Sequence, residues 1–327
     1  MTKKNIALVT GGYSGEAVIS YKSAETIFKN IDQEKWNCYI IDIHPTGWFH
    51  PTSTGEKIAV DKNDFSIIVA GEKIQFEAVL VGLHGTPGED GKLQGYFDCL
   101  HIPYTSCNAA TSALTFNKRY TVAVAAFAGL HVAKSMHLFK ADGTTASTVA
   151  AQLTLPLFVK PNNGGSSIGM SKVTNAGDLE AAIAKAFLED DQVLVEEFIK
   201  GREFTIGVFK SKGKIIALPI TEIISKNEFF DFEAKYEGAS EEITPAQIGG
   251  DVANKVRDNA VKAYKVFNCN GIVRIDFIYD EKHGNPVLLE INTVPGQSAA
   301  SLVPQQVVAM GWSLKDFYSA LIEECFN

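Results

Sequence analysis

The strand-like stretch "LLEINTVPGQS" at residues 288–298 carries two oxygen-bearing side chains, Glu290 and Asn292, in alternation with apolar residues. Residues two apart in a β-strand point to the same face, so these side chains would stand together while Leu289 and Ile291 face the opposite way. Two oxygen ligands placed in this way could meet one cation. A half-exposed strand whose polar face meets water is the alternative interpretation.

A second stretch, "GIVRIDFIYD" at residues 271–280, places Arg274 and Asp276 on one strand face. If the two stretches pair across the turn "EKHGNP", Asp276 joins Glu290 and Asn292, with Arg274 beside them. Carboxylate and amide oxygens without His or Cys are typical ligands of Mg²⁺ or Mn²⁺ and suit a cation that also carries nucleotide phosphates. An Arg–Asp pair beside an unrelated polar patch is the alternative.

A metal that carries phosphates needs a nucleotide, and "LFVKPNNGGSSIGMSKV" at residues 157–173 offers a holder for one. Lys160 ends a predicted strand. The following turn through Gly164 and Gly165 to Ser166 and Ser167 can present backbone N–H groups and two hydroxyls to anionic oxygens. It lacks the spacing of a Walker motif, and a plain hairpin loop remains possible.

The stretch "VLVEEFIKGREFTIGV" at residues 193–208 adds candidates for the rest of a nucleotide. A strand followed by a short linker could offer backbone groups to adenine, and an acidic residue beyond it could bind ribose hydroxyls. A solvated acidic run is the alternative. Lys118, in "TFNKRY", is a second candidate for binding phosphate, although a lone lysine there is usually exposed surface.

The elements that must position these residues begin with an α/β unit. A β-branched run, a Gly-Gly turn and an amphipathic stretch predict a strand, a turn and a helix over residues 5–31. Further strands are predicted at 37–43, 76–85 and 101–106. This order predicts an open parallel sheet with helices between its strands.

The remainder of the chain changes pattern twice. After a helix that follows residue 115, "PLFVKP" and "SIGMSKV" predict paired strands, with a helix near 176–188 and a strand at "QVLVEEFI". The last third has long apolar strands around a polar loop near 226–246 and a helix near 249–267. The predicted class is therefore α/β and α+β. The expected units are an N-terminal α/β domain (1–106), a central domain (107–196) and a C-terminal domain (197–327).

Composition narrows the function class. The 327 residues are 46% hydrophobic and 21% charged, typical of a soluble globular chain of two or three domains. A net charge of −8 argues against a generic nucleic-acid or anionic-membrane surface. Five separated cysteines form no C-x-x-C motif, no run approaches membrane-spanning length, and the N-terminus is unlike a signal peptide. We expect a cytoplasmic protein that acts on small molecules, with no nucleic-acid or membrane partner.

Taken together, the motifs resemble the D-alanine–D-alanine ligase family of the ATP-grasp superfamily over nearly the whole chain. The matching pieces are "GGYSGE", "GLHGTPGEDGKLQGYFD", "IPYTS", "VKPNNGGSSIGMSKV", "EEFIKGREFTIGV", "FFDFEAKY", "VRIDF", "LLEINTVPGQS" and "SLVPQ". One departure follows Glu16, where the family usually has a basic residue and then Val-Ser, whereas this chain has Ala17 and Ile19. The resemblance implies an ATP-grasp fold of three domains, with ATP held between the central and C-terminal ones.

The resemblance also implies the reaction. ATP would phosphorylate the carboxylate of one D-alanine, and the amine of a second D-alanine would displace phosphate from the acyl phosphate. The enzyme would be an ADP-forming carbon–nitrogen ligase that makes D-alanyl-D-alanine for peptidoglycan precursors. We expect a homodimer.

Residue roles follow from the same resemblance. The implied nucleotide-binding residues are Lys118, Lys160, Ser166 and Ser167 for phosphates, Glu196, Glu197 and Ile199 for adenine, Glu203 for ribose, and Lys235. The implied ligands of two Mg²⁺ or Mn²⁺ ions are Asp276, Glu290 and Asn292. Glu16 would bind the ammonium of the first D-alanine in a network with Ser166 and Tyr236.

The remaining implied residues concern the intermediate and the acceptor. Arg274 and the Gly296 N–H would face the oxyanion of the tetrahedral intermediate. Lys235, Ser301 and the Leu302 N–H, at the start of a predicted helix, would take the carboxylate of the second D-alanine, and His84 would line the acceptor site.

Two other functions stay open. Another ATP-grasp carboxylate–amine or carboxylate–hydroxyl ligase, such as a D-alanine–D-lactate ligase, would keep the ATP and metal residues but change the "EAKY" loop and the acceptor pocket. Tyr236 counts against the lactate variant. A non-catalytic ATP-binding module should have lost Arg274 or a metal ligand, and this sequence has lost neither.

Overall fold

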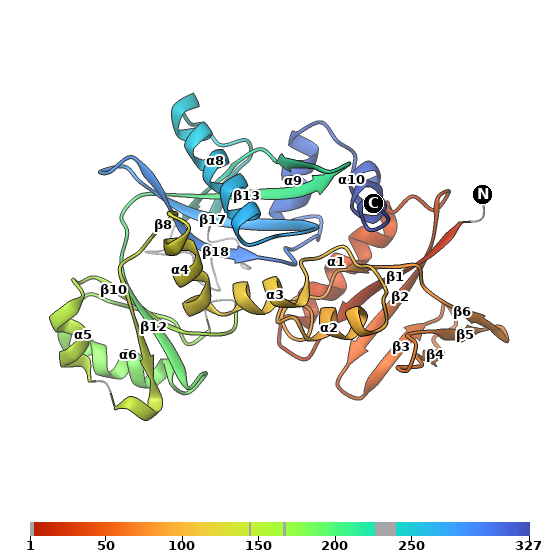
Figure 1. Ribbon diagram of the computed structural model, residues 1–327, viewed down its shortest axis with the longest axis horizontal. Helices are drawn as coiled ribbons and strands as arrows, with labels where there is room; N and C mark the ends of the chain where they lie inside the picture. The colour runs from red at the N-terminus through yellow and green to blue at the C-terminus, as the bar shows by residue number, and fades with distance from the viewer. Residues whose placement is uncertain (1–2, 144, 166–167, 226–239) are drawn as a thin grey trace.

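The computed structural model of the chain has three main β-sheets with helices packed against them (Figure 1). It describes residues 3–143, 145–165, 168–225 and 240–327. The strands are β1 (Lys4–Gly11), β2 (Trp36–His44), β3 (Gly47–Pro51), β4 (Lys57–Ala59), β5 (Ile67–Val69), β6 (Glu72–Ile74), β7 (Ala78–Val81), β8 (His131–Val132), β9 (Ser135–Phe139), β10 (Leu157–Pro161), β11 (Ser171–Val173), β12 (Gln192–Glu197), β13 (Arg202–Ser211), β14 (Lys214–Ala217), β15 (Thr221–Ser225), β16 (Ser240–Ile243), β17 (Ile272–Asp280) and β18 (Asn285–Asn292). The helices are α1 (Ala17–Asn30), α2 (Lys92–Cys99), α3 (Ala109–Phe116), α4 (Lys118–Phe127), α5 (Ala146–Gln152), α6 (Leu179–Ala186), α8 (Gly250–Val266), α9 (Leu302–Ala309) and α10 (Leu314–Glu324).

The N-terminal sheet has the strand order β4-β3-β2-β1-β7. The parallel prediction is confirmed for β1, which pairs in parallel with β2 and with β7. It is wrong at the other edge, where β3 and β4 add antiparallel strands. The two-residue connection between His44 and Gly47 allows only a hairpin, because a parallel return needs a long crossover. The predicted strand at 101–106 is reduced to a single bridge between Val79 and Tyr104.

Helix α1 covers one face of this sheet and shares its core with the end of the chain. Ile6 and Leu8 of β1 and Ile27 of α1 belong to the same buried cluster as Phe317 and Leu321 of α10. In Figure 1, α9 and α10 accordingly lie between the N-terminal sheet and the sheet of β13 and β17. The last helix therefore completes the core that the first strand begins.

The central sheet is antiparallel, in the order β11-β10-β12-β9, and lies at the lower left of Figure 1. The predicted pairing of β10 with β11 is confirmed, and β12 follows as predicted. Leu157 and Val159 of β10 pack with Ile183 of α6 and Val149 of α5 in one buried cluster. The alternate residues of β10, including Lys160, face the other side of the sheet.

The third sheet has seven strands, in which β13, β17 and β18 are central neighbours and β8 lies at one edge. The predicted hairpin of β17 and β18 is confirmed. Strand β16 lies within the stretch predicted as a polar loop, where it pairs with β15. β16 lies at an edge of the sheet, and its sequence is polar and acidic. A strand of this kind lacks the hydrophobic pattern by which strands are predicted from sequence.

Residues near the first predicted domain boundary pack with the third sheet. Cys107, Ala125 and Leu130 are buried in one cluster with Phe204 and Ile275. The stretch from 107 to 132 thus lies on the C-terminal sheet before the chain enters the central sheet at β9. We therefore propose the three-domain division with one change, in which the stretch from 107 to 132 packs with the C-terminal domain.

Candidate active site

The hairpin of β17 and β18 brings the three predicted metal ligands together. In its register Asp276 lies opposite Glu290, Arg274 lies opposite Asn292, and a β-bulge follows Asp276. The amide Nδ2 of Asn292 lies 3.1 Å from Asp276 Oδ2 and 3.4 Å from Glu290 Oε1. The convergence expected from alternation on two paired strands is therefore present.

Arg274 joins this group through its guanidinium. Its Nε lies 2.9 Å from Asp276 Oδ1 and one terminal nitrogen lies 2.7 Å from Asp276 Oδ2, a two-pronged ion pair. The same terminal nitrogen lies 3.6 Å from Glu290 Oε1. Thr205 of β13 donates its hydroxyl to Asp276, whose side chain is buried. The guanidinium thus neutralises part of the negative charge of these two carboxylates, at the place where a metal cation would bind.

The donor set fits a hard cation that shares its ligands with phosphates. Asp276 and Glu290 supply carboxylate oxygens and Asn292 an amide, the chemistry that Mg²⁺ and Mn²⁺ prefer. Within the described ranges no three His, Cys, Asp or Glu side chains form a metal-binding cluster, so a protein-only zinc site is not found there. Two carboxylates and an amide leave coordination positions for substrate oxygens and water, as is usual for Mg²⁺ with nucleotides.

Lys118 meets the predicted phosphate loop at the start of α4. Its backbone N–H donates to the Asn162 carbonyl at 3.0 Å, and its Nζ donates to the Gly164 carbonyl at 2.8 Å. Asn162 Oδ1 also accepts the N–H of Arg119 at 2.9 Å. The loop is therefore fastened to the N-terminus of α4, a position that favours anions. Ser166 and Ser167 lie outside the described residues.

Lys160 projects from the β10 face opposite the central core, where it pairs with the Glu196 carboxylate of β12. The N–H of Glu197 donates to the backbone carbonyl of Lys134, and its carboxylate accepts the Thr154 N–H at 2.9 Å. Its predicted adenine contact would have to use the carbonyl. These contacts place the lysine and both glutamates on one sheet.

Ile199 and Glu203 continue from this sheet to the next. Ile199 lies in the connection between β12 and β13, and Glu203 lies on β13 opposite Ile278 of β17. The predicted nucleotide residues therefore follow a path from the central sheet to the strand beside the β17–β18 hairpin. Lys235 and Tyr236 lie outside the described residues.

Glu16 stands at the N-terminus of α1, where its carboxylate reaches two glycines from other parts of the chain. A Cβ on Gly85 would lie 2.5 Å from Glu16 Oε2, and a Cβ on Gly165 would lie 2.8 Å from Glu16 Oε1. Gly85 also has φ +68°, a left-handed conformation that favours glycine. The absence of side chains at both positions lets the carboxylate lie between the loop after β7 and the phosphate loop.

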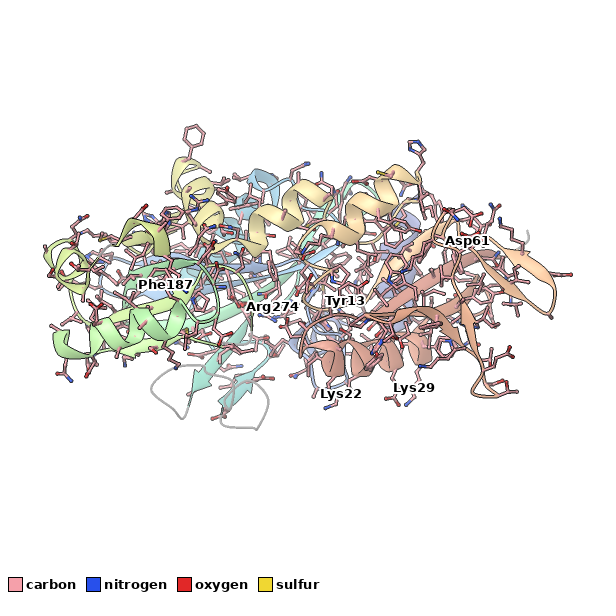
Figure 2. The ribbon with its side chains drawn as sticks, turned by 90° about the horizontal axis from the view of Figure 1, so that it is seen from below. Tyr13, Lys22, Lys29, Asp61, Phe187 and Arg274 are labelled. Atoms are coloured by element: carbon pink, nitrogen blue, oxygen red, sulfur yellow. The ribbon has the colours of Figure 1, made fainter. Side chains whose placement is uncertain are left out.

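A single cavity of about 340 Å³ collects side chains from these parts, and we refer to it as the site cavity. Figure 2 shows Arg274 near the middle of the molecule, between the sheets and α1. The described residues that line the cavity include Glu16, Lys22, His84, Glu89, Lys118, Gly164, Gly165, Glu242, Arg274, Glu290, Asn292, Gly296, Ser301 and Leu302. The N-terminal loops, the phosphate loop and the β17–β18 hairpin therefore open onto one space.

Gly296 and Ser301 both line the site cavity and lie close together. A Cβ on Gly296 would lie 2.7 Å from the Ser301 hydroxyl, which is 2.8 Å from that of Ser298. Ser301 is the N-cap of α9, with no side-chain capping bond, and Leu302 is the first helical residue. The predicted helix start is confirmed, and its N–H groups are suited to a carboxylate.

His84 is buried and held by protein groups on both ring nitrogens. Nδ1 lies 2.7 Å from the Val294 carbonyl oxygen, and Nε2 lies 2.8 Å from the Ser23 hydroxyl. Burial, helped by the charge of Arg274, lowers its pKa to about 4, although the hydrogen bond to the Val294 carbonyl acts in the opposite direction. The ring is therefore neutral near pH 7 and its contacts position the backbone after β18, although it also lines the cavity.

Glu89 is a site residue that the sequence analysis did not single out. Its carboxylate accepts the N–H of Gly85 at 2.7 Å and that of Val294 at 3.3 Å. Burial, followed by the charge of Glu16, raises its pKa to about 8. Its position in "GTPGEDG" was the available signal, but nothing local reveals that its partner lies 205 residues away.

Comparisons with known proteins agree over the full length of the chain. The family model for the D-ala D-ala ligase N-terminus matches residues 5–107, and that for the C-terminus matches residues 117–323. A D-alanine–D-alanine ligase of Parabacteroides distasonis is 46% identical over 98% of this chain and 97% of its own length. That of Porphyromonas gingivalis is 42% identical over 100% of this chain and 99% of its own.

Solved structures agree as well. The VanG D-Ala:D-Ser ligase from Enterococcus faecalis has a TM-score of 0.89 at 31% identity, over 99% of this chain and 100% of that chain. The Bacillus anthracis D-alanine–D-alanine ligase complexed with ATP has a TM-score of 0.79 at 26% identity, over 99% and 97%. The fold is therefore that of the ATP-grasp ligases. With its motifs, site geometry and full-length matches, the chain belongs to the D-alanine–D-alanine ligase family.

Proposed function

We propose that this protein joins two D-alanine molecules into D-alanyl-D-alanine, with conversion of ATP to ADP and phosphate, for peptidoglycan precursor synthesis. The observation that supports this proposal most directly is the site cavity, which is lined by Glu16, Lys118 and Arg274 from three parts of the chain. A carboxylate for an ammonium, a lysine for phosphate and a guanidinium for developing negative charge are the groups that this reaction needs.

The donor D-alanine binds with its ammonium at Glu16 and its carboxylate toward the β17–β18 hairpin. The γ-phosphate of ATP is held by Lys118, Lys160 and the phosphate loop that includes Ser166 and Ser167. Attack by the donor carboxylate oxygen on this phosphorus breaks the bond to the β-phosphate and gives an acyl phosphate and ADP. The adenosine lies along Glu196, Glu197, Ile199 and Glu203, and Lys235 also contacts the nucleotide.

The acceptor D-alanine places its carboxylate at Ser301 and the Leu302 N–H, with Lys235. Its deprotonated amine attacks the acyl carbon, and phosphate leaves. Arg274 and the Gly296 N–H stabilise the oxyanion of the tetrahedral intermediate. Tyr236, with Ser166 and Glu16, keeps the donor in place.

Asp276, Glu290 and Asn292 would hold two Mg²⁺ or Mn²⁺ ions. Bound there, the ions would neutralise charge on the transferring phosphoryl group. Arg274 would then give up part of its pairing with Asp276, which frees donors for the reacting phosphoryl and acyl oxygens.

The test is phosphate release by the purified protein with ATP and Mg²⁺, with products identified by mass spectrometry. D-alanine, D-serine and D-lactate are supplied as acceptors, because VanG, similar to this chain, is a D-Ala:D-Ser ligase. We expect D-alanine-dependent phosphate release and D-alanyl-D-alanine as the main product. ATP hydrolysis without a coupled product would contradict the proposal, and predominant D-alanyl-D-serine or D-alanyl-D-lactate would reassign the acceptor.

We further propose a cytoplasmic location and a homodimer, with no nucleic-acid or membrane partner. In the described residues, no helix combines the length and apolar character needed to cross a membrane. Sedimentation analysis measures the oligomeric state directly, and a monomer at micromolar concentration would contradict the dimer.

A further inference from the structure

One cation of the site cavity has no assigned role. The cavity is lined in the described chain by three basic side chains with fixed charge: Lys22, Lys118 and Arg274. Lys118 bonds to the Gly164 carbonyl and Arg274 pairs with Asp276. For Lys22, the described residues supply no carboxylate within ion-pair distance.

The position of Lys22 along α1 places it on the cavity wall. Ile19, three residues earlier on the same helix face, lines the same cavity. Ser23, the next residue, accepts the Gln297 N–H at 3.0 Å and bonds His84. These buried bonds fix this turn of α1 against the segment that leads to Ser301.

The surroundings of Lys22 are mostly acidic. The carboxyl groups of Glu16, Glu242 and Glu290 line the same cavity, whereas that of Glu89, with its raised pKa, is mostly protonated near neutral pH. Arg274 and Lys118 already have proposed roles toward phosphoryl and acyl oxygens, whereas Lys22 is contributed to the cavity by α1 and has none. An acceptor that carries its own carboxylate would be repelled by the glutamates unless a cation on its side compensates.

We propose that Lys22 is an acceptor-binding residue that supplies positive charge to the acceptor's carboxylate, in the cavity that the N-terminus of α9 also lines. This inference rests on the proposed function and adds a determinant of acceptor choice to it. The ligand class is an α-amino acid with a free carboxylate, in preference to its neutral amide. Because the lysine is exposed, its contribution is moderate. Removal of its charge should weaken the preference for the acceptor with a free carboxylate over its amide about tenfold.

Lys29 provides a matched control on the same helix. Lys22 and Lys29 leave α1 on the same side (Figure 2), and Lys29 pairs with Glu25 at 2.6 Å. Lys29 is absent from the described lining of the cavity, and Lys22 is nearer the helix N-terminus where the cavity lies. Lys22→Met and Lys29→Met remove the same charge and keep a side chain of similar length.

The experiment supplies ATP, D-alanine and D-alaninamide at equal concentrations of the two possible acceptors. Mass spectrometry then measures the ratio of D-alanyl-D-alanine to D-alanyl-D-alaninamide. We expect Lys22→Met to shift this ratio about tenfold toward the amide, with an unchanged KM for ATP. Lys29→Met should keep the wild-type ratio, and Lys22→Arg should restore most of it.

The possible failures are distinguishable. An unchanged ratio in Lys22→Met overturns the role of Lys22 while dipeptide formation by the wild type still supports the proposed function. An equal shift in Lys29→Met overturns it as well, since a general change in surface charge would then be responsible. A wild-type protein that makes neither product overturns the proposed function and the inference with it.

Discussion

The Nδ1 atom of His84 lies 2.7 Å from the carbonyl oxygen of Val294, which joins the loop after β7 to the segment after β18. A carbonyl oxygen can only accept, so Nδ1 carries the proton and Nε2 accepts the hydroxyl hydrogen of Ser23. The Val294 N–H donates to Glu89, so both backbone groups of this residue are held by the N-terminal domain. Gly296, whose N–H is proposed to face the oxyanion of the tetrahedral intermediate, lies two residues after Val294.

We predict that His84→Asn changes the pH dependence of stability. The pKa of His84 is about 4 in the folded chain and about 6.5 when unfolded, so its contribution is present above pH 6.5 and is lost as pH falls toward 4. Asparagine keeps a donor for Val294 but does not titrate. Between pH 7 and pH 5 the wild type should lose on the order of 2 kcal/mol more than the variant in urea unfolding. Parallel curves would refute a neutral buried ring.

We predict the opposite pH effect for Glu89→Gln. The pKa of Glu89 is raised from 4.5 to about 8, so its stabilising contribution is complete below pH 4.5 and is lost as pH rises through 8. From pH 6 to 8.5 the wild type should lose on the order of 3 kcal/mol more than the variant. Between pH 4.5 and 6.5 the effects of His84 and Glu89 oppose each other. In this window the stability of the wild type and that of the double variant should both depend little on pH, whereas each single variant should show the slope of the group that remains. A single variant with no such slope in urea unfolding would contradict the assignment of the remaining group.

Glu290→Gln tests the proposed metal site. The change keeps the shape of the side chain but removes a charge from the ligand set, so Mn²⁺ binding should weaken and turnover should fall at least a hundredfold. Electron paramagnetic resonance measures Mn²⁺ affinity independently of activity, and circular dichroism checks folding. Glu281→Gln, in the turn of the same hairpin, is the control. Wild-type Mn²⁺ affinity in folded Glu290→Gln would remove Glu290 from the site.

Lys160→Ala should raise the KM for ATP at least tenfold and change the KM values for D-alanine little, because it removes a positive charge from the triphosphate path. The substitution leaves Glu196 without its ion-pair partner, so Lys160→Ala should also be measured together with Glu196→Gln. Lys134→Ala, which removes an exposed lysine near Glu197, is the control. A loss confined to D-alanine would place Lys160 in the amino-acid pocket.

Gly85→Ala should displace the carboxylate of Glu16, because the new methyl group would lie 2.5 Å from Oε2. The KM for the donor D-alanine should rise about tenfold or more, beyond any loss of stability. Gly143→Ala is the matched control: it also has a positive φ, +59°, but its Cβ would face open space. Both variants should lose about 1 kcal/mol of stability from backbone strain. Equal donor KM values in the two would show that Glu16 does not bind the donor.

The sequence predicted the site best where local periodicity decides geometry. Alternation along two strands, with a short Gly- and Pro-containing turn, was enough to bring Asp276, Glu290 and Asn292 together. The pairing of β10 with β11 followed from similarly local signals. Roles of individual residues came from the resemblance to the ligase family rather than from these patterns.

Long-range contacts could not be predicted in this way. The bond between Glu89 and Val294 depends on how the N-terminal sheet meets the third sheet, which no local pattern specifies. The pairing of Arg274 with Asp276 was visible as a strand neighbour, but the added contact from Thr205 required the register of β13. The short β8 was missed because two residues carry no periodicity, and its pairing with β18 depends on tertiary context.

The shared core of β1 and α10 has a consequence for synthesis of the chain. Ile6 and Leu8 leave the ribosome long before Phe317 and Leu321, which share their buried cluster. Until α10 has been synthesised, the N-terminal sheet has an apolar face without its cover, a state that favours aggregation or binding by chaperones. Removal of the final helix should therefore expose the core of the first domain rather than shorten only the last one.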